Sequence, residues 1–128
     1  MVACMREVPP SLRTWFVIHF IIDVLFAAPL FVAPRFTLGL FGWAEVDPVA
    51  TRLVAAALFG IGIQSFLGRQ QSIDAYLGML NLKIIWSLLA TAGIFISLLG
   101  GAAPVAWVLC AVFAIFNAIW ITYRWRLR

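Results

Sequence analysis

Residues 15–32 constrain the fold more than any other part of this chain. They are almost all apolar, yet His19 and Asp23 stand in the middle of the run. An α-helix of this length covers about 27 Å, which is close to the thickness of a bilayer core. A charged side chain at mid-membrane costs at least about 2.5–3.5 kcal/mol. We therefore expect Asp23 to face other helices, where a partner, a proton or water stabilises it.

The composition indicates that lipid is the solvent for this chain. Hydrophobic residues make up 65% of it and charged residues only 11%, whereas soluble domains carry about 25% charged residues. The net charge of +4 comes from basic residues at the ends of apolar segments, where they meet anionic lipid headgroups. The partner that this pattern predicts is therefore membrane lipid and not nucleic acid.

Apolar segments bounded by Pro, Gly and Asp predict four membrane-spanning helices. Asp47 and Pro48 are typical of a helix start, with Asp as the N-cap and Pro at the first helical position. The short turn at 69–72 predicts that the helices on either side of it are antiparallel neighbours. We expect helices at about 12–32, 48–67, 73–99 and 104–123, with Ser11 as the cap of the first. The predicted fold is all-α: one domain over residues 1–128, an integral membrane four-helix up-down bundle.

The distribution of arginines predicts the orientation of this bundle. Four spans place both termini on the same side of the membrane. Arg35 and Arg52 belong to the opposite side. Because cytoplasmic loops carry the excess of basic residues, we expect both termini in the cytoplasm and the protein in the cell inner membrane. The arginines predicted on the cytoplasmic side are Arg6, Arg13, Arg69, Arg124, Arg126 and Arg128.

Polar side chains within the four spans fall in the predicted cytoplasmic half. Counting the helical rise from each cytoplasmic end places them at similar depths, and each helix contributes at least one. We therefore expect a polar pocket that opens to the cytoplasm and is closed on the other side by apolar residues. Trp86 is predicted near this pocket. It either lines the pocket and stacks on a flat ligand or packs against lipid or the protein core. The candidate ligand or proton site comprises Asp23, His19, Lys83, Asn81, Asn117, Gln64 and Trp86.

Asp23 and Lys83 lie at matching depths on different helices, and their role has two readings. They form a structural ion pair that removes two charges from lipid, or they form a ligand or proton site. Lys83 reaching to the cytoplasmic surface is a further alternative, which leaves Asp23 protonated or hydrogen-bonded. His19 is one turn from Asp23 on the same face, a spacing that allows a hydrogen bond and proton relay.

The chain lacks the sequence patterns that carry enzymatic chemistry. It has no Gly-rich phosphate loop, no zinc motif, no paired carboxylates and no Ser/His/Asp arrangement at usable depth. We therefore expect that the protein is not an enzyme, with no catalytic residues, no metal and no cofactor.

One stretch resembles a known family. Residues 30–63 read LFVAPRFTLGLFGWAEVDPVATRLVAAALFGIGI. A helix that ends near Pro, a connector rich in Leu and Gly, and a helix that opens with Arg-Leu and continues with small residues resemble the small four-helix DoxX-like membrane proteins. The resemblance implies an up-down four-helix bundle. Some such proteins are partners of membrane oxidoreductases, and related four-helix folds bind sterols or other lipids through acidic residues.

Three functions are consistent with these features. The first is the binding or carrying of a small amphipathic ligand in the polar pocket. The second is proton-coupled transport by an oligomer, with Asp23 alternating between proton and substrate. The third is the role of an accessory subunit in a larger membrane complex. A stripe of small residues predicts the docking face for a homo-oligomer or such a complex; it comprises Ala106, Cys110, Ala114 and Ala118.

Overall fold

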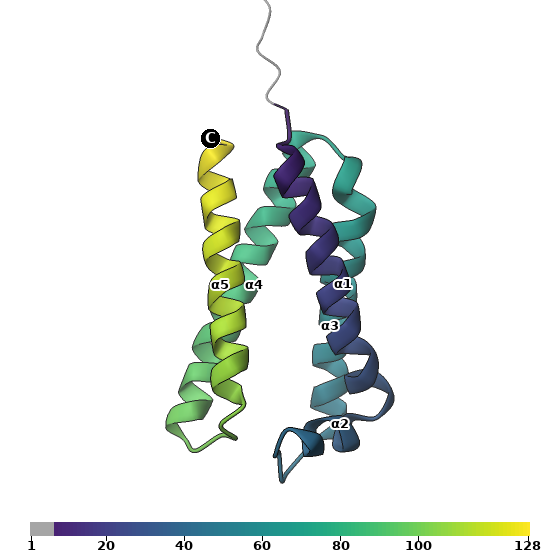
Figure 1. Ribbon diagram of the computed structural model, residues 1–128, viewed down its shortest axis with the longest axis vertical. Helices are drawn as coiled ribbons and strands as arrows, with labels where there is room; N and C mark the ends of the chain where they lie inside the picture. Colours follow the sequence, from purple (N-terminus) through teal and green to yellow (C-terminus); the bar gives the residue numbers. More distant parts are fainter. Residues whose placement is uncertain (1–6) are drawn as a thin grey trace, which may run out of the picture.

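The regular structure that the computed structural model describes is entirely helical. It covers residues 7–128, so Arg6 and its predicted location lie outside the described residues. Four of the helices in these residues are long enough to span a membrane, and Figure 1 shows a short helix that follows the first of them. The elements are α1 (Pro10–Val32), α2 (Pro34–Leu40), α3 (Pro48–Leu67), the 3-10 turn η1 (Gly68–Gln70), α4 (Ile73–Leu99) and α5 (Ala106–Arg126).

The four long helices have the length and composition of membrane spans. Their most apolar stretches have mean hydropathies between 1.5 and 2.2. Large apolar side chains such as Leu25, Leu89 and Ile96 are exposed on their outer faces. An outer surface of this kind is stable in lipid and not in water. The structure therefore confirms the prediction of an all-α integral membrane protein with four spans.

The long helices pack as two pairs. Backbones approach closely between α1 and α3 and between α4 and α5. α3 and α4, which the short turn predicts to be antiparallel neighbours, have no comparably close backbone approach; they diverge away from η1, as Figure 1 shows, and contact each other through side chains such as Lys83 and Ser65. Small residues explain the first pair, since Ala27 and Ala55 are completely buried where the two helices touch.

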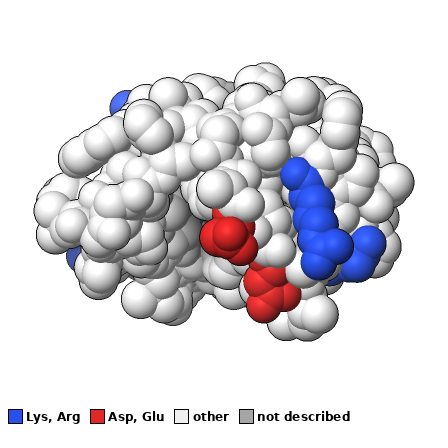
Figure 2. Space-filling model, turned by 90° about the horizontal axis from the view of Figure 1, so that it is seen from below, with Lys and Arg blue, Asp and Glu red and all other residues white. Residues whose placement is uncertain are grey.

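Both ends of the described chain lie at one end of the molecule. In Figure 1 the start of α1 and the end of α5 are at the top, and α2 is at the bottom. Figure 2 shows the α2 end, where charged side chains gather on one part of the face and leave large uncharged areas. The two chain ends lie together because the chain crosses the length of the molecule an even number of times.

The helix ends differ in detail from the sequence-based expectation. α1 begins at Pro10, and Ser11 is its second residue and not its cap. Proline at the first helical position has no N–H to satisfy, so the helix starts there. Asp47 does cap α3, since its Oδ1 accepts hydrogen bonds from the backbone N–H of Val49 at 2.8 Å and of Ala50 at 3.2 Å. α5 begins at Ala106, two residues after the proline expected to open it.

A layer of large aromatic side chains joins the two pairs near the end that carries the C-terminus. Phe16 of α1, Tyr76 of α4 and Trp120 of α5 are all completely buried. The ring of Phe16 lies 4.6 Å from that of Tyr76 and 5.8 Å from that of Trp120, between ring centres. The Tyr76 hydroxyl and the Arg13 guanidinium both donate to the carbonyl oxygen of Arg69. This layer covers one side of the polar cluster described next.

Candidate functional site

Lys83 is a buried polar side chain that connects the two helix pairs. It projects from α4 and is only 2% exposed. Its Nζ lies 2.8 Å from His19 Nδ1 on α1 and donates to Ser65 Oγ on α3 at 2.6 Å. The same Nζ lies 5.0 Å from the ring centre of Phe16 and 4.9 Å from that of Trp120. Two aromatic faces and two polar atoms thus stabilise an ammonium group in the protein interior.

His19 contacts both an amine and a carboxylate through one nitrogen. Its Nδ1 lies 3.0 Å from Asp23 Oδ2, one turn along α1, and 2.8 Å from Lys83 Nζ. In a neutral imidazole, this atom either donates its proton or accepts one. It therefore cannot donate to Asp23 while it accepts from Lys83. The position of a single proton decides which of the two neighbours is hydrogen-bonded to the ring.

Asp23 is the member of the cluster whose hydrogen bonding is incomplete. It is 5% exposed, and among residues 7–128 its Oδ2 accepts no hydrogen bond, although Nδ1 of His19 lies beside it. The two observations agree if the ring accepts from Lys83, because Nδ1 then has no proton to share. Asp23 also lies directly against Gly62 of α3, where an added Cβ would be 2.7 Å from the Asp23 Cβ. The carboxylate is therefore held in place by close backbone packing.

A second group of polar side chains extends the cluster along α4 and α5. Asn117 Nδ2 donates to the carbonyl oxygen of Ile84 and to Ser87 Oγ, each at 3.0 Å. Ser87 in turn donates to the carbonyl oxygen of Lys83 at 2.7 Å. Asn117 is thus joined to the backbone of Lys83 through one hydroxyl. These bonds hold α4 against α5 and fix the turn from which Lys83 projects.

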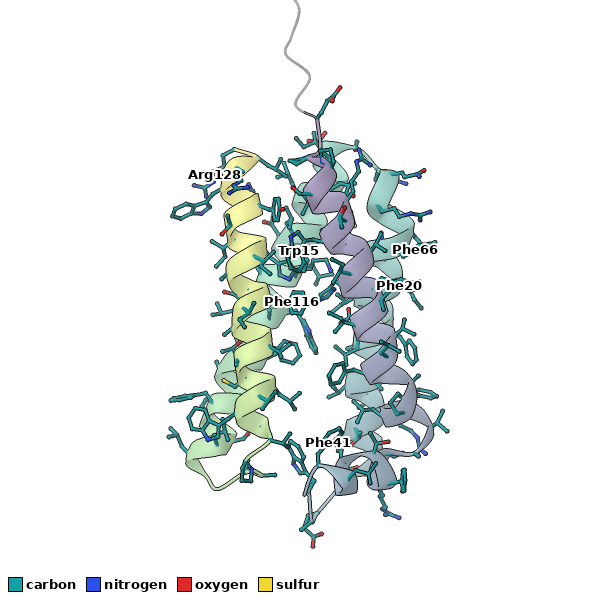
Figure 3. The ribbon with its side chains drawn as sticks, in the orientation of Figure 1. Trp15, Phe20, Phe41, Phe66, Phe116 and Arg128 are labelled. Atoms are coloured by element: carbon teal, nitrogen blue, oxygen red, sulfur yellow. The ribbon has the colours of Figure 1, made fainter. Side chains whose placement is uncertain are left out.

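The space beside the cluster is small. A cavity of about 10 Å³ is lined by His19, Lys83, Ser87 and four aromatic side chains, Trp86, Phe113, Phe116 and Trp120. Room of this size accommodates about one water molecule. The expected pocket open to the cytoplasm is not seen at this cluster, where aromatic side chains line a small cavity beside the charged groups. Figure 3 shows Trp15 and Phe116 among the side chains between the two pairs.

Two of the candidate site residues lie outside the cluster. Gln64 is exposed, and its Nε2 lies 3.9 Å from the sulfur of Met79. Asn81 is also exposed, and its Oδ1 accepts from Arg124 Nε at 2.9 Å. The expectation that all the polar side chains converge is therefore wrong for these two. Each contacts a neighbouring helix from an exposed position, Gln64 contacting α4 and Asn81 contacting α5, and not the cluster.

Sequence reasoning missed the residues of α3 that complete the site. Ser65 is 1% exposed and accepts from Lys83, and Gly62 makes room for Asp23. Both are small, and small residues are common in apolar spans. A signal was available in their spacing, since they are three residues apart on one helical face.

The stripe of small residues on α5 does not form one exposed face. Ala106 and Cys110 are buried, and Cys110 Sγ lies 3.7 Å from the carbonyl oxygen of Thr91 on α4. Ala114 and Ala118 are exposed. The first half of the stripe therefore serves packing within the α4/α5 pair, and only the second half is available to lipid or to another chain.

These features define a small multi-pass integral membrane protein with four spans and a buried Lys–His–Asp cluster between two helix pairs. No family model, curated protein or solved structure matches the chain. The resemblance to DoxX-like proteins is therefore supported only by the four long apolar helices, which are compatible with a small four-helix membrane protein.

Proposed function

We propose that this protein is a non-enzymatic membrane carrier. It binds a small amphipathic molecule in the space between its two helix pairs and moves it in response to protonation. The observation that carries the proposal is the position of Lys83. It belongs to the α4/α5 pair, yet its ammonium group binds His19 and Ser65 of the α1/α3 pair. Any change in the charge of this group or of its partners alters the contact between the pairs.

The geometry supports a proton path of two steps. A proton on Lys83 Nζ can pass over 2.8 Å to Nδ1 of His19, which leaves a neutral amine and an imidazolium. The same nitrogen can then release a proton over 3.0 Å to Asp23 Oδ2, which restores the neutral ring and gives a neutral carboxylic acid. Histidine is suited to such a relay because it gains and loses protons near physiological pH.

A ligand reaches this cluster only if the helix pairs separate. The cavity of about 10 Å³ is too small for an amphipathic molecule. However, the closest backbone contacts lie within the pairs and not between them. The two pairs are joined by side chains, including the buried aromatic layer, and not by close backbone packing, so we expect them to part as units when the cluster changes its protonation state. A molecule with an apolar body would then contact Trp86 and Phe113 while its polar end replaces a partner of Lys83.

The orientation we propose places both termini in the cytoplasm of a cell with an inner membrane. Five arginines of the described chain are at or near the end that carries the C-terminus, whereas Arg35 and Arg52 are near the α2 end. This imbalance follows the excess of basic residues in cytoplasmic segments. A C-terminal fusion to a reporter that fluoresces only in the cytoplasm tests it.

The proposal is tested by measuring protons and bound molecules in the same preparations. Protein in lipid vesicles loaded with pyranine, a pH-sensitive dye, receives an acid pulse from outside. We expect wild-type protein to acidify the interior faster than empty vesicles once the co-purifying small molecules are added back. Mass spectrometry at pH 5 and pH 8 identifies these molecules and shows whether the pH releases them.

The variant Asp23→Asn keeps the shape of the side chain and removes its charge. We expect it to abolish the acidification and the pH-dependent release, whereas Asp74→Asn, in the exposed first turn of α4, retains both. Binding without any flux in the wild-type protein would indicate a static binder. A chain that binds nothing and co-purifies with other membrane proteins would indicate an accessory subunit, and either result would contradict the carrier.

A further inference from the structure

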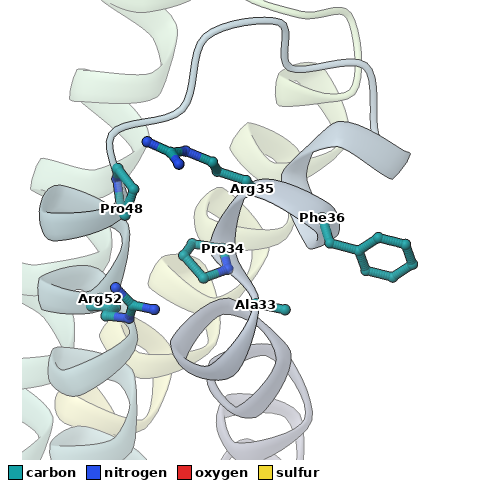
Figure 4. Close-up of a pocket in the computed structure, with 6 residues that line it drawn as sticks. All are labelled: Ala33, Pro34, Arg35, Phe36, Pro48 and Arg52. Carbon is teal, nitrogen blue, oxygen red and sulfur yellow. The ribbon is translucent and has the colours of Figure 1, made fainter.

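The α2 end of the molecule carries a second polar feature, which the proposed carrier function does not use. An open pocket of about 220 Å³ lies where α1, α2 and the start of α3 meet. Figure 4 shows the Arg35 side chain extending from α2 toward Pro48, and that of Arg52 extending from α3 toward the junction of α1 and α2. The lining residues are Ala33, Pro34, Arg35, Phe36, Pro48 and Arg52.

The guanidinium of Arg52 is oriented by the backbone. Its Nε donates to the carbonyl oxygen of Phe31 at 3.0 Å. That carbonyl belongs to the last turn of α1, where carbonyl groups have no partner within the helix. The bond uses the Nε–H of the guanidinium and leaves the N–H groups of its terminal nitrogens available to a ligand.

Both arginines retain their positive charge without a carboxylate partner. Neither forms an ion pair within residues 7–128, where the recorded pair is that of His19 and Asp23. Asp47 directly precedes Pro48, which lines the pocket, but its carboxylate caps α3. The pocket therefore presents two guanidinium groups that form no ion pair within residues 7–128, at the end of two membrane spans, with Glu45 and Asp47 on the segment that connects α2 to α3.

We infer that this pocket binds the phosphate group of an anionic membrane lipid. Guanidinium groups bind phosphate through paired N–H donors, so two of them on facing elements suit one phosphate. Their place at the ends of α1 and α3 is the level at which lipid headgroups lie. A volume of about 220 Å³ is below that of pockets for drug-sized molecules, about 300–1,000 Å³, and suits a headgroup.

The surface beside the pocket favours a lipid over free phosphate. Phe36 and Leu40 of α2 are 70% and 69% exposed. They stand on a short helix that connects two spans, so they provide apolar contact for the acyl chain next to the headgroup. Free phosphate would use the same arginines but would gain nothing from these side chains.

Native mass spectrometry of the detergent-purified protein measures this binding directly. The protein is titrated with phosphatidylglycerol, and the dissociation constant of the first lipid is compared between variants. The double variant Arg35→Gln/Arg52→Gln should bind about twenty-fivefold more weakly, since each basic side chain that contacts the bound anionic headgroup contributes about a fivefold gain. The matched control is Arg126→Gln/Arg128→Gln, which removes the same charge at the opposite end and should change the constant less than twofold.

Additional measurements separate the possible outcomes. Arg35→Gln alone should weaken the binding of phosphatidylglycerol about fivefold. The Arg35 side chain has no hydrogen bond within residues 7–128, so we expect this variant to fold like the wild type. Phosphatidylcholine and inorganic phosphate should both bind more weakly than phosphatidylglycerol. Equal binding of either one, an unchanged constant in the double variant, or an equal loss in the control would overturn the lipid site.

Discussion

Replacing Lys83 by methionine tests whether the buried cluster behaves as one electrostatic unit. Methionine has a similar length and no charge, so the change removes the ammonium group and leaves His19 and Asp23 in place. Lys83 Nζ and Asp23 Oδ2 lie within about 6 Å of each other, because both are within 3.0 Å of the same nitrogen. At an effective dielectric constant of about 20, unit charges at this separation attract each other by about 3 kcal/mol.

The loss of stability follows from this attraction and from the isolated carboxylate. Lys83 and Asp23 are bridged by His19 and do not form a direct ion pair. Removing one of two buried opposite charges nevertheless leaves the other buried, which costs about 3–5 kcal/mol in a direct pair. Uptake of a proton by Asp23 reduces this penalty. We therefore expect Lys83→Met to lower the free energy of unfolding by about 3 kcal/mol, whereas Arg128→Met, which removes an exposed cation, should change it by less than about 0.5 kcal/mol.

A double-mutant cycle measures the interaction itself. Unfolding is followed by circular dichroism as dodecyl sulfate is added to protein in mild detergent, for Lys83→Met, Asp23→Asn and the double variant. Replacing both charges removes the pair without leaving either member alone, so the double variant should lie within about 1 kcal/mol of the wild type. Because Lys83→Met alone should cost about 3 kcal/mol, the coupling energy should then be at least about 2 kcal/mol, and larger by whatever Asp23→Asn loses on its own. Coupling below about 0.5 kcal/mol would refute the reasoning, because the two charges would then act independently.

Two further predictions concern the packing and the ends of α3. Gly62→Ala places a methyl group 2.7 Å from the Asp23 Cβ and should destabilise the fold by about 1–3 kcal/mol, whereas Gly60→Ala meets nothing within 4 Å. Equal melting temperatures for these variants in detergent would contradict the packing of α1 on α3. Asp47→Ala removes the N-cap of α3 and should cost about 0.5–2 kcal/mol in the same assay, with the exposed Glu45→Ala as its control. A loss of similar size in the control would show that general charge, and not the cap, is responsible.

The sequence was sufficient to predict the spans and the central charged residues. Four apolar segments are long enough to cross a membrane, and apolar length alone determines this property. The inward direction of Asp23 and Lys83 was predictable because a charge facing lipid is too costly. Both are buried, and His19 joins them through a single nitrogen.

The pairing of the helices and the rotation of each helix could not be read from the sequence. Gln64 and Ser65 are neighbours on α3, yet Ser65 accepts from Lys83 and Gln64 is exposed. Depth follows from counting residues, whereas direction depends on which helix packs on which face. Neutral polar side chains have a smaller penalty in lipid than charged ones, so polarity alone did not identify the inward one. The enclosure of the cluster by aromatic rings likewise depends on side chains from α1, α4 and α5 together.

The one-turn spacing of His19 and Asp23 has a consequence for the synthesis of this protein. During translation α1 leaves the ribosome long before α4, so the carboxylate enters the bilayer when its amine counterpart does not yet exist. The imidazole on the same helix is already present and can hydrogen-bond the acid during that interval. The first part of the chain to be synthesised therefore carries its own temporary partner for Asp23. Lys83 joins His19 and Asp23 only after α4 has been made.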